Sequence, residues 1–397
     1  MEPMGVGVIG TGDISDVYLA NLNKYPQVVR LVAAQNRTRA KAERQAARYG
    51  IGRVHDTVEE LVADPEVELV LNLTTPDAHA AINDAALAAG RHVYSEKPLA
   101  TTTQDARRTL DHAHDLGLRL GCAPDTWLGG RAQTMREIID SGQVGEITAG
   151  VATIVYPGLE WFHPSPFQSY RADVGPLADI GIYYVSVLVS LLGPVRQVAA
   201  MGKRTFDERT AHYGPIAGRP IPVEVETHVS ASLLFESGAI VTLLVSTDVP
   251  DSQLPRLELY GTSGTLCMPE AEPMAGPNIF GGPLWIRTLD EARFKDIPRP
   301  DPMPWTAAEN HHRFNETDFG ADPSVPRINS RGIGLVDEVL AIAEGRPMRC
   351  SGELAHHVLD VIESIYTSSR RRLFVDVASS CRRPAPLPAD FPDSEPV

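Results

Sequence analysis

Two kinds of hydrophobic pattern alternate along the first third of the chain. Short apolar runs bounded by polar residues are typical of buried strands, and they occupy residues 5–9, 28–34, 69–73, 92–95 and 119–122. Between them, segments with the period of an amphipathic helix occupy residues 17–22, 38–49, 78–89 and 102–116. Strands that alternate with helices form βαβ units, so this region predicts a doubly wound parallel sheet that ends near residue 123.

After residue 123 the strands follow one another more directly. Apolar runs predict mostly antiparallel strands at residues 147–156, 195–201, 223–235, 239–249, 256–260 and 265–268, and helices at 130–140 and 175–189. We therefore expect a first domain over residues 1–123 and a second α/β domain over 124–330. Helices within 331–375 are expected to pack back on the first domain, and the Pro- and acid-rich segment 382–397 is expected to be a flexible tail.

The composition of the chain indicates which binding partners are disfavoured and in which cellular compartment the protein is expected. The 397 residues carry a net charge of −15, which disfavours binding to nucleic acid and to anionic membranes. No C-x-x-C pair is present, and the pair His311-His312 lacks an acidic or cysteine partner at ligand spacing, so no metal site is predicted. Scattered cysteines, a strand that starts at residue 5 and the lack of an apolar run of about 18 residues predict a cytoplasmic protein without signal peptide or membrane span.

A glycine-rich turn follows the first predicted strand. Gly10 and Gly12 match the first two glycines of the G-x-G-x-x-G pattern, and Ser15 takes the place of the third. Gly10 permits the tight turn, while Gly12 lets backbone N–H groups approach a pyrophosphate at the start of a helix that we expect Asp13 to cap. The predicted dinucleotide contacts are Gly10, Thr11, Gly12, Asp13, Ile14, Asn36, Arg37, Thr74, Thr75, Pro76, His79, Glu96 and Lys97.

The end of the second predicted strand bears on the choice of nicotinamide cofactor. NAD-selective sites usually place an Asp or Glu there, which accepts a hydrogen bond from the ribose 2′-OH. This chain has Asn36, Arg37 and Arg39 instead, and a guanidinium can pair with a 2′-phosphate. The pattern favours NADP(H), with NAD(H) still open. The alternative interpretation is that the arginines only solvate the start of a helix.

The stretch from His92 to Thr102 places Glu96 and Lys97 between a short strand and Pro98. Open α/β sheets bind their ligands at the carboxyl ends of parallel strands, so this pair is a candidate for the site. For an isolated Glu-Lys dipeptide, a surface ion pair is the alternative. His79 lies in the first turn of the helix that follows the preceding strand, and it is either a cofactor contact or a structural histidine.

In this order and spacing, the glycine turn, the run Thr75-Pro76-x-x-His79 and the triplet Glu96-Lys97-Pro98 resemble one oxidoreductase family. It is the glucose–fructose oxidoreductase, inositol dehydrogenase and rhizopine-catabolism family (Gfo/Idh/MocA), and the resemblance covers nearly the whole chain. It implies an N-terminal Rossmann domain and a C-terminal α/β domain on a large open, mostly antiparallel sheet. It also implies NAD(P)-dependent hydride transfer at a sugar or polyol carbon, with Lys97 near the nicotinamide and the reacting hydroxyl.

The second signature of this family is a glycine-led helix that carries Asp and, four residues later, usually His. Asp179 and Tyr183 stand at these positions, so the resemblance assigns them, with Lys97, to catalysis. Tyr replaces His, as in the glucose–fructose oxidoreductase and dihydrodiol dehydrogenase branches, and Gly175 is all that remains of a glycine triplet. Two assignments of the proton chemistry stay open: a Tyr183 phenolate favoured by an adjacent Lys97, or Lys97 alone with Tyr183 as a hydrogen-bonding group.

An aromatic and proline-rich segment over residues 161–171 is a candidate substrate loop. Sugars bind by stacking on aromatic faces and by hydrogen bonds to their hydroxyls; an ordinary packed loop is the alternative. The predicted substrate contacts are Asp125, Trp161, His163 and Arg171. A second subunit often covers one face of an open sheet of this kind, so we expect a homo-oligomer, either a dimer or a tetramer.

These patterns predict an NAD(P)-dependent oxidoreductase that transfers a hydride between nicotinamide and a secondary alcohol or ketone carbon of a sugar, glycoside or polyol. A redox-assisted glycosidase, or a sugar oxidoreductase with a tightly bound cofactor, is the alternative within enzymes. A non-catalytic dinucleotide sensor is the alternative from another class. The sequence does not distinguish which sugar is used, at which carbon, or in which direction.

Overall fold

A computed structural model of the chain describes residues 2–172, 174–269, 279–289, 303–314 and 329–392. The chain divides into two compact units. The first comprises Met1–Leu128, Gly320–Glu363 and Pro392–Val397, and the second comprises Gly129–Phe319 and Ser364–Phe391.

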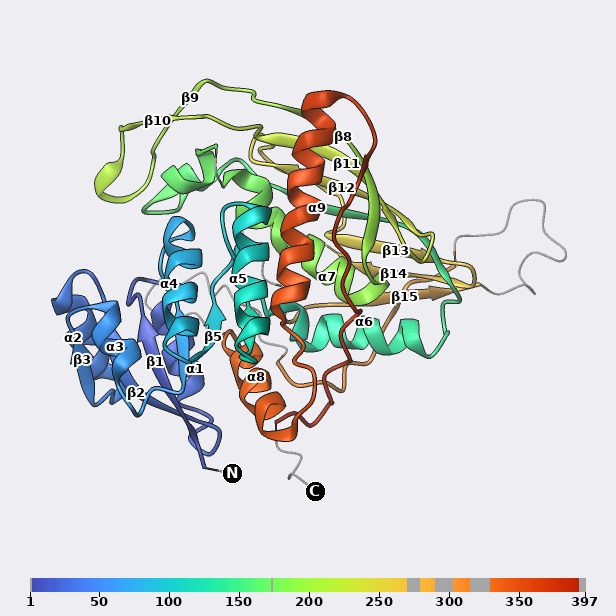
Figure 1. The fold of residues 1–397 in the computed structure, drawn as a ribbon. Helices are drawn as coiled ribbons and strands as arrows, with labels where there is room; N and C mark the ends of the chain where they lie inside the picture. Colours follow the sequence, from blue (N-terminus) through green and yellow to red (C-terminus); the bar gives the residue numbers. More distant parts are fainter. Residues whose placement is uncertain (1, 173, 270–278, 290–302, 315–328, 393–397) are drawn as a thin grey trace, which may run out of the picture. The chain divides into compact units, whose positions relative to one another are not determined.

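The first unit is built on a six-stranded sheet in the order β3-β2-β1-β4-β5-β6, in which every described pair is parallel (Figure 1). The strands are β1 (Met4–Ile9), β2 (Val29–Gln35), β3 (Arg53–His55), β4 (Leu69–Asn72), β5 (His92–Ser95) and β6 (Leu120–Cys122). This order confirms the predicted doubly wound sheet. It places the switch point between β1 and β4, where sheets of this kind bind ligands.

Helices connect these strands and bury their apolar stripes against the sheet. They are α1 (Ser15–Leu22), α2 (Arg39–Tyr49), α3 (Val58–Ala63), α4 (Pro76–Ala88), α5 (Thr103–Asp115) and α8 (Ile333–Glu344), with the first part of α9 (Gly352–Arg371). Thr57 and Thr102 cap α3 and α5 by accepting hydrogen bonds from Glu60 N and Asp105 N. Most of these helices match the predicted segments, but α3 was not predicted, because six residues are too few to establish a helical period.

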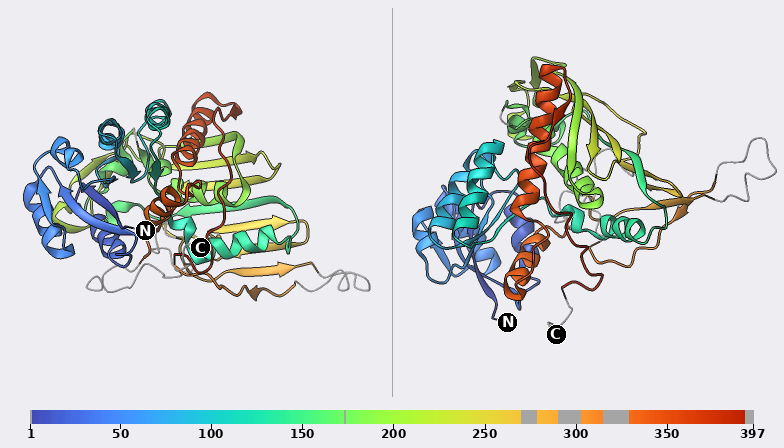
Figure 2. Two further views of the ribbon diagram at one scale, coloured as in Figure 1. Left: turned by 60° about the horizontal axis from the view of Figure 1, so that its bottom comes forward. Right: turned by 45° about the vertical axis from the view of Figure 1, so that its right-hand side comes forward.

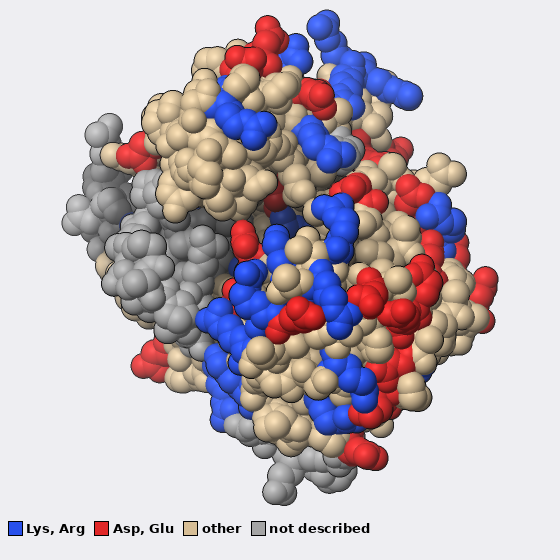
Figure 3. All heavy atoms as spheres, turned by 90° about the vertical axis from the view of Figure 1, so that its left-hand side faces the viewer, with Lys and Arg blue, Asp and Glu red and all other residues tan. Residues whose placement is uncertain are grey.

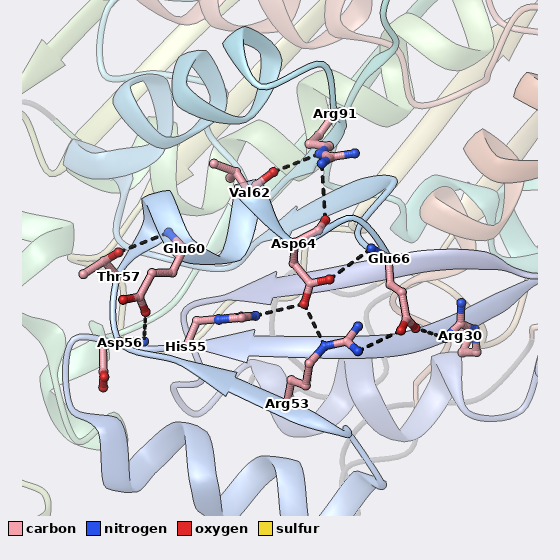
Figure 4. Close-up of polar contacts among 10 residues, drawn as sticks. All are labelled: Arg30, Arg53, His55, Asp56, Thr57, Glu60, Val62, Asp64, Glu66 and Arg91. Carbon is pink, nitrogen blue, oxygen red and sulfur yellow. Dashed lines mark hydrogen bonds and ion pairs between the residues drawn. The ribbon is translucent and has the colours of Figure 1, made fainter.

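Strand β3, which was also not predicted, is an edge strand held by ion pairs rather than by apolar side chains. Arg53 donates to Asp64 at 2.7 Å and to Glu66 at 2.8 Å, and His55 Nε2 lies 3.0 Å from Asp64 (Figure 4). Hydrogen bonds from Arg53 and Arg30 lower the pKa of Glu66 to about 2. A strand stabilised in this way has no two-residue apolar period, so the hydrophobic pattern does not reveal it.

The second unit is built on a nine-stranded sheet in the order β16-β15-β14-β13-β7-β12-β11-β8-β17 (Figure 2). Its strands are β7 (Ile147–Val155), β8 (Val195–Lys203), β11 (His228–Phe235), β12 (Ile240–Ser246), β13 (Leu257–Gly261), β14 (Gly264–Met268), β15 (Trp285–Thr288), β16 (Thr306–Ala307) and β17 (Val375–Asp376). Among the described pairs, β7 and β12 are parallel and the others antiparallel, which confirms the mostly antiparallel sheet. Two strands are clearly shorter than predicted, since residues 223–227 and 247–249 lie outside the sheet.

The helices of the second unit are α6 (Gly130–Asp140), α7 (Ile182–Leu192) and the last part of α9. Every residue of α7 is buried, as expected for a helix that is apolar on all sides. A π-helical turn, η4 (Leu177–Gly181), leads into α7, so the predicted single helix over 175–189 is divided in two. A two-stranded arm consists of β9 (Glu208–Thr210) and β10 (Pro220–Pro222), joined through η5 (Gly214–Ile216).

The segment predicted to be a flexible tail is anchored as far as Phe391, and this prediction is wrong over that range. Leu387 and Phe391 are buried, the Leu387 N–H donates to Gln133 Oε1 at 2.7 Å, and Arg136 donates to the Pro384 carbonyl at 2.8 Å. A proline-rich segment can pack in this way because its carbonyl groups find partners on a neighbouring helix. Residues 393–397 lie outside the described range.

Two properties of the whole described chain complete the fold. Among the described helices there is none with the length and apolar character needed to cross a membrane. All four cysteines lie in the described ranges and none of them forms a disulfide; three of them, Cys122, Cys267 and Cys350, are buried.

Candidate functional site

The glycine turn after β1 has the geometry of a ligand cradle. Gly10 has φ +91°, and a Cβ there would lie 2.7 Å from the carbonyl of Leu73, so both the backbone and the close approach to the end of β4 require glycine. A Cβ on Gly12 would meet nothing within 4 Å. The fold therefore does not require glycine at position 12, and the open space beside it fits the approach of a pyrophosphate to the backbone.

The turn is closed by Ser15 rather than by the predicted cap Asp13. Ser15 donates to the Gly12 carbonyl from its backbone N at 3.0 Å and from its hydroxyl at 2.6 Å. The N-cap position of α1 falls on Ile14, which makes no side-chain capping bond, and Asp13 is exposed. The prediction that Asp13 caps the helix is therefore wrong, because the serine hydroxyl already holds the turn.

The β2 end of the site is tied to the same turn. Asn36 Nδ2 donates to Thr11 Oγ1 at 2.9 Å, and Thr11 is buried. Arg39 is occupied, since it pairs with Glu43 at 2.8 Å and with Asp56. The sequence suggested that the Arg39 guanidinium could bind a 2′-phosphate, but in the structure it is already paired with these two carboxylates.

Three cationic residues that were not predicted, Lys41, Arg44 and Arg48, line a hollow beside the glycine turn. The hollow measures about 350 Å³ and is lined by Thr11, Gly12, Asp13, Asp16, Lys41, Arg44, Gln45 and Arg48. Arg48 pairs with Asp16 at 2.7 Å, whereas Lys41, Arg44 and also Arg37 have no ion pair within the described ranges. Figure 3 shows Lys and Arg side chains gathered on the face that carries α2, although the net charge of the chain is −15.

Lys97 stands at the carboxyl end of β5, where its backbone is held by the neighbouring glutamate. Glu96 is buried, and its Oε2 accepts from the Lys97 N–H at 2.8 Å. Its Oε1 accepts from Tyr18 Oη, also at 2.8 Å. Burial, and then the charge of Glu96, raise the pKa of Tyr18 well above its usual value, so Tyr18 stays a neutral donor. Glu96 thus orients the turn that carries Lys97.

His79 joins the turns that follow β4 and β5. Its ring is fully buried, with Nδ1 2.6 Å from the Pro98 carbonyl oxygen and Nε2 3.1 Å from the Thr74 carbonyl oxygen. Burial lowers the pKa of His79, so the ring is neutral and donates its single N–H to one of the two carbonyls. We interpret His79 as a positioning residue for the Lys97 turn, while a direct cofactor contact stays a prediction.

The remaining contacts predicted at this edge differ in exposure. Thr74 Oγ1 donates to Asn72 Oδ1 at 2.7 Å, whereas Thr75 is exposed and makes no capping bond to α4, which Pro76 begins. Asp125 is fully buried, and its Oδ2 accepts from the N–H groups of Gly332 and Gly334, at the start of α8. Burial raises the pKa of Asp125 to about 6. Its role as a substrate contact stays a prediction.

In the second unit, Asp179 lies in the π-helical turn and Tyr183 lies in the first turn of α7. Asp179 accepts a hydrogen bond from the Ser169 hydroxyl, and Tyr183 is buried. Single π-helical turns within helices are frequent at functional sites, and the catalytic roles of Asp179 and Tyr183 stay predictions. Lys97 belongs to the first unit and this pair to the second.

A buried cluster of charged side chains packs beneath the predicted substrate loop. This cluster was not predicted from the sequence. Arg209 bridges two carboxylates, Glu160 and Asp248, and donates to the Thr247 carbonyl at 2.8 Å. Tyr170 donates to the other oxygen of Glu160, and burial raises the pKa of Tyr170 above its usual range. The partners of Arg209 are 49 and 39 residues away along the chain, so no local pattern identifies them.

The predicted substrate contacts on the loop lie in different surroundings. Trp161 is 52% exposed and stacks on His212, with ring centroids 3.9 Å apart and 15° between the planes. His163 Nδ1 accepts from the Ser165 N–H at 3.0 Å, and Arg171 is exposed. The loop therefore presents an exposed aromatic ring beside polar groups, and its role in binding substrate stays a prediction.

Comparison with known families matches both parts of the chain. Residues 4–123 match the model described as an oxidoreductase family with an NAD-binding Rossmann fold. Residues 132–267 match the model of the GFO/IDH/MocA C-terminal domain. The two matched segments together span more than half of the chain.

Individual proteins show similarities of different extent. A 1,5-anhydro-D-fructose reductase from Ensifer adhaerens is 32% identical over 238 residues, which cover 57% of this chain and 65% of the reductase. The crystal structure of an NAD binding oxidoreductase from Klebsiella pneumoniae is similar with a TM-score of 0.78 at 24% identity, covering 96% of this chain and 100% of that one. Levoglucosan dehydrogenase in complex with NADH and levoglucosan gives a TM-score of 0.75 at 21% identity, covering 95% and 100%. The structural similarities show a shared fold.

Proposed function

The chain belongs to the GFO/IDH/MocA family of NAD-binding oxidoreductases, and we propose that it transfers a hydride between a nicotinamide cofactor and a secondary alcohol or ketone carbon of a sugar, glycoside or polyol. The observation that carries this proposal is the turn that fixes Lys97 at the carboxyl edge of the sheet. Glu96 and His79 hold this turn on the same sheet edge as the open glycine cradle. The reductase and the dehydrogenase that resemble this chain have sugars or anhydrosugars in their names, which supports the substrate class.

The division of labour follows from the chemistry of each group. When bound, the cofactor supplies or accepts the hydride at its nicotinamide ring. The backbone around Gly12 and the start of α1 bind its pyrophosphate. The Lys97 ammonium holds or releases the proton of the reacting hydroxyl, and in the second unit Asp179 and Tyr183 orient the substrate or share that proton.

A substrate panel tests the proposed function. Purified protein is mixed with NADPH or NADP⁺, and in parallel with NADH or NAD⁺, and absorbance at 340 nm is followed with aldoses, ketoses, anhydrosugars, inositols, glycosides and disaccharides. We expect turnover with at least one of these substrates. Cofactor that co-purifies, together with product formation without a net change at 340 nm, would instead identify the bound-cofactor mechanism. Tight cofactor binding without any product would favour the dinucleotide sensor.

We propose that NADP(H) is the preferred cofactor, on the basis of the cations at the glycine turn. Lys41 and Arg44 project from α2 into the hollow that Gly12 and Thr11 line, and neither has an ion pair among the described residues. Arg37 adds a third such cation after β2. Unpaired cations beside the ribose end of a dinucleotide site favour a 2′-phosphate, because they repay the desolvation of its charge.

Replacing Arg44 with glutamate tests this preference. We expect the Kd for NADPH to rise by at least about tenfold, equivalent to ~1.4 kcal/mol, while the Kd for NADH changes by less than about threefold. The Arg37→Asp variant should behave in the same way. Arg39→Glu is the matched control, since Arg39 is already paired with Glu43. Titration of intrinsic fluorescence with each nucleotide gives the constants. An equal loss of both cofactors would remove these cations from the 2′-phosphate site.

We propose that a second copy of the chain covers the outer face of the nine-stranded sheet. Met201 is 81% exposed and Ile240 is 52% exposed, and strand register places both on the same face as Ser230 and Leu244. Apart from His228, β11 and β12 carry hydroxyl and aliphatic side chains on this face and no carboxylate, so two copies can meet there without the repulsion expected from chains of charge −15.

A charge placed on this face tests the oligomer. We expect Ile240→Glu to shift the protein toward a monomer in size-exclusion chromatography with light scattering at about 10 μM, because each subunit of a symmetric pair would bury the new charge. Leu254→Glu, at an exposed position outside the strands, is the matched control and should leave the mass unchanged. A wild-type mass equal to one chain would refute this proposal.

A further inference from the structure

We infer that the stacked pair Trp161–His212 forms a subsite for a second sugar ring, so the preferred substrate is a glycoside or disaccharide rather than a free monosaccharide. This inference rests on the proposed function. It goes further by naming a platform for the part of the substrate that does not react. The argument depends on contacts within the second unit alone.

The two rings of the pair come from separate elements that are fixed to each other. Trp161 ends the short helix η2 (Leu159–Trp161), and His212 follows strand β9 of the two-stranded arm. The His212 backbone N–H donates to the carbonyl of Glu160 at 2.8 Å, next to the indole. The imidazole thus covers one face of the indole, at a centroid separation of 3.9 Å.

Trp161 is largely exposed to solvent although its ring is held in place by the stacked His212. Trp161 keeps 52% of its surface exposed with one ring face already covered, so its other face is open to a ligand. A preformed indole surface loses little conformational entropy when it binds, and an apolar C–H face of a pyranose matches it. Single exposed aromatic residues are common on protein surfaces. An indole that is held in place by a second ring and still exposed is better explained as a binding surface.

The platform is built on a rigid base. Arg209 on β9 bridges Glu160 and Asp248 in the buried interior of the unit. Between the arm and the loop lies a small core of Tyr170, Ala211, Ile221 and Val223. The arm and the loop therefore act as one body, and the position of the indole is set before a ligand arrives.

The same base connects the platform with Asp179, the aspartate that the family resemblance assigns to catalysis. Glu160 accepts from the Tyr170 hydroxyl, and the adjacent Ser169 donates to Asp179. A short chain of contacts thus joins the residue before Trp161 to Asp179. A sugar ring that stacks on Trp161 is consequently held at a fixed distance from Asp179, as a subsite for a second ring requires.

Binding is tested first, without turnover. The chain is labelled with 5-fluorotryptophan, saturated with NADPH, and titrated with cellobiose, maltose or D-glucose while fluorine NMR is recorded. The Trp161 resonance is assigned as the signal that is absent from the spectrum of the Trp161→Phe variant. We expect it to shift in a saturable way with at least one disaccharide, and much less with glucose. No shift up to about 50 mM of either disaccharide would overturn the inference.

Kinetics provide the second test, with the sugars that the substrate panel shows to turn over. Trp161→Ala should lower kcat/KM for a disaccharide or glycoside by at least about tenfold. The kcat/KM for the matching monosaccharide should stay within about twofold of the wild-type value. His212→Ala should show a smaller loss in the same direction. Phe374→Ala, which removes another exposed aromatic ring of this unit, is the control. Equal losses on both substrate classes, or a changed oligomer mass in Trp161→Ala, would overturn the inference.

The two proposals fail in different ways. Turnover of monosaccharides with no role for Trp161 refutes the subsite and leaves the proposed function standing. A saturable shift of the Trp161 resonance without hydride transfer to any sugar refutes the proposed function, because binding alone would then explain the platform.

Discussion

Replacing Lys97 with methionine is expected to lower kcat by about 10²–10⁴-fold, the contribution of a general acid–base group, because no neighbouring side chain of its turn replaces the ammonium. The Kd for NADPH should stay within about tenfold of wild type, since the glycine turn that binds the pyrophosphate is untouched. Single-turnover absorbance at 340 nm measures the chemical step, and nucleotide titration measures the affinity.

Lys24→Met is the matched control, as Lys24 is an exposed lysine of the same unit whose ammonium donates to Asn21 Oδ1 at 2.7 Å. Its activity should equal that of wild type. Normal turnover in Lys97→Met would remove Lys97 from the chemistry. Retention of a regulatory activity in that variant would support the sensor class instead.

Tyr183→Phe separates the two assignments of the proton chemistry. If Tyr183 gives up the proton, kcat should fall by about 10²–10⁴-fold and the pH profile should lose one ionisation. If Lys97 acts alone, the loss should stay within about tenfold and the profile should keep its shape. Either outcome fixes which group transfers the proton.

Replacing Arg209 with methionine should destabilise the second unit by about 3–5 kcal/mol, the cost of removing one partner from a buried ion pair. Glu160 and Asp248 would be left buried without their counter-charge, and methionine keeps much of the side-chain volume. Hydrogen exchange measured by mass spectrometry should show loss of protection in residues 157–171 and 207–223. A calorimetric scan should show the matching fall in Tm.

The control for this substitution lies in the same segment. Arg204 pairs with Asp207 at the surface, so Arg204→Met should cost less than about 1 kcal/mol. Similar stability of Arg209→Met and Arg204→Met would show that the buried cluster contributes no more than a surface pair. The supporting role assigned to it under the Trp161 platform would then fail as well.

Local pattern was enough to predict most of the first unit. The turn at Gly10 follows an apolar strand and precedes a helix, and this order alone indicates a dinucleotide fold. Periodic apolar positions placed most of the described helices within one or two residues of their ends. Elements without such a period were missed, such as β3, whose Arg53 and His55 are held by ion pairs.

The amino-acid sequence by itself therefore determined the fold class, the dinucleotide turn and the family, because each depends on residues close together in the chain. Only the tertiary structure decided which side chains support the site. Lys41 is far from Gly12 along the chain, and Arg209 is far from its two carboxylates. Contacts between such distant residues produce no periodic pattern in the sequence, because only folding brings them together. Lys41 and Arg44 at the cofactor turn and the stacking of Trp161 on His212 belong to this second class, whereas Arg37 and Trp161 themselves were predicted from the sequence.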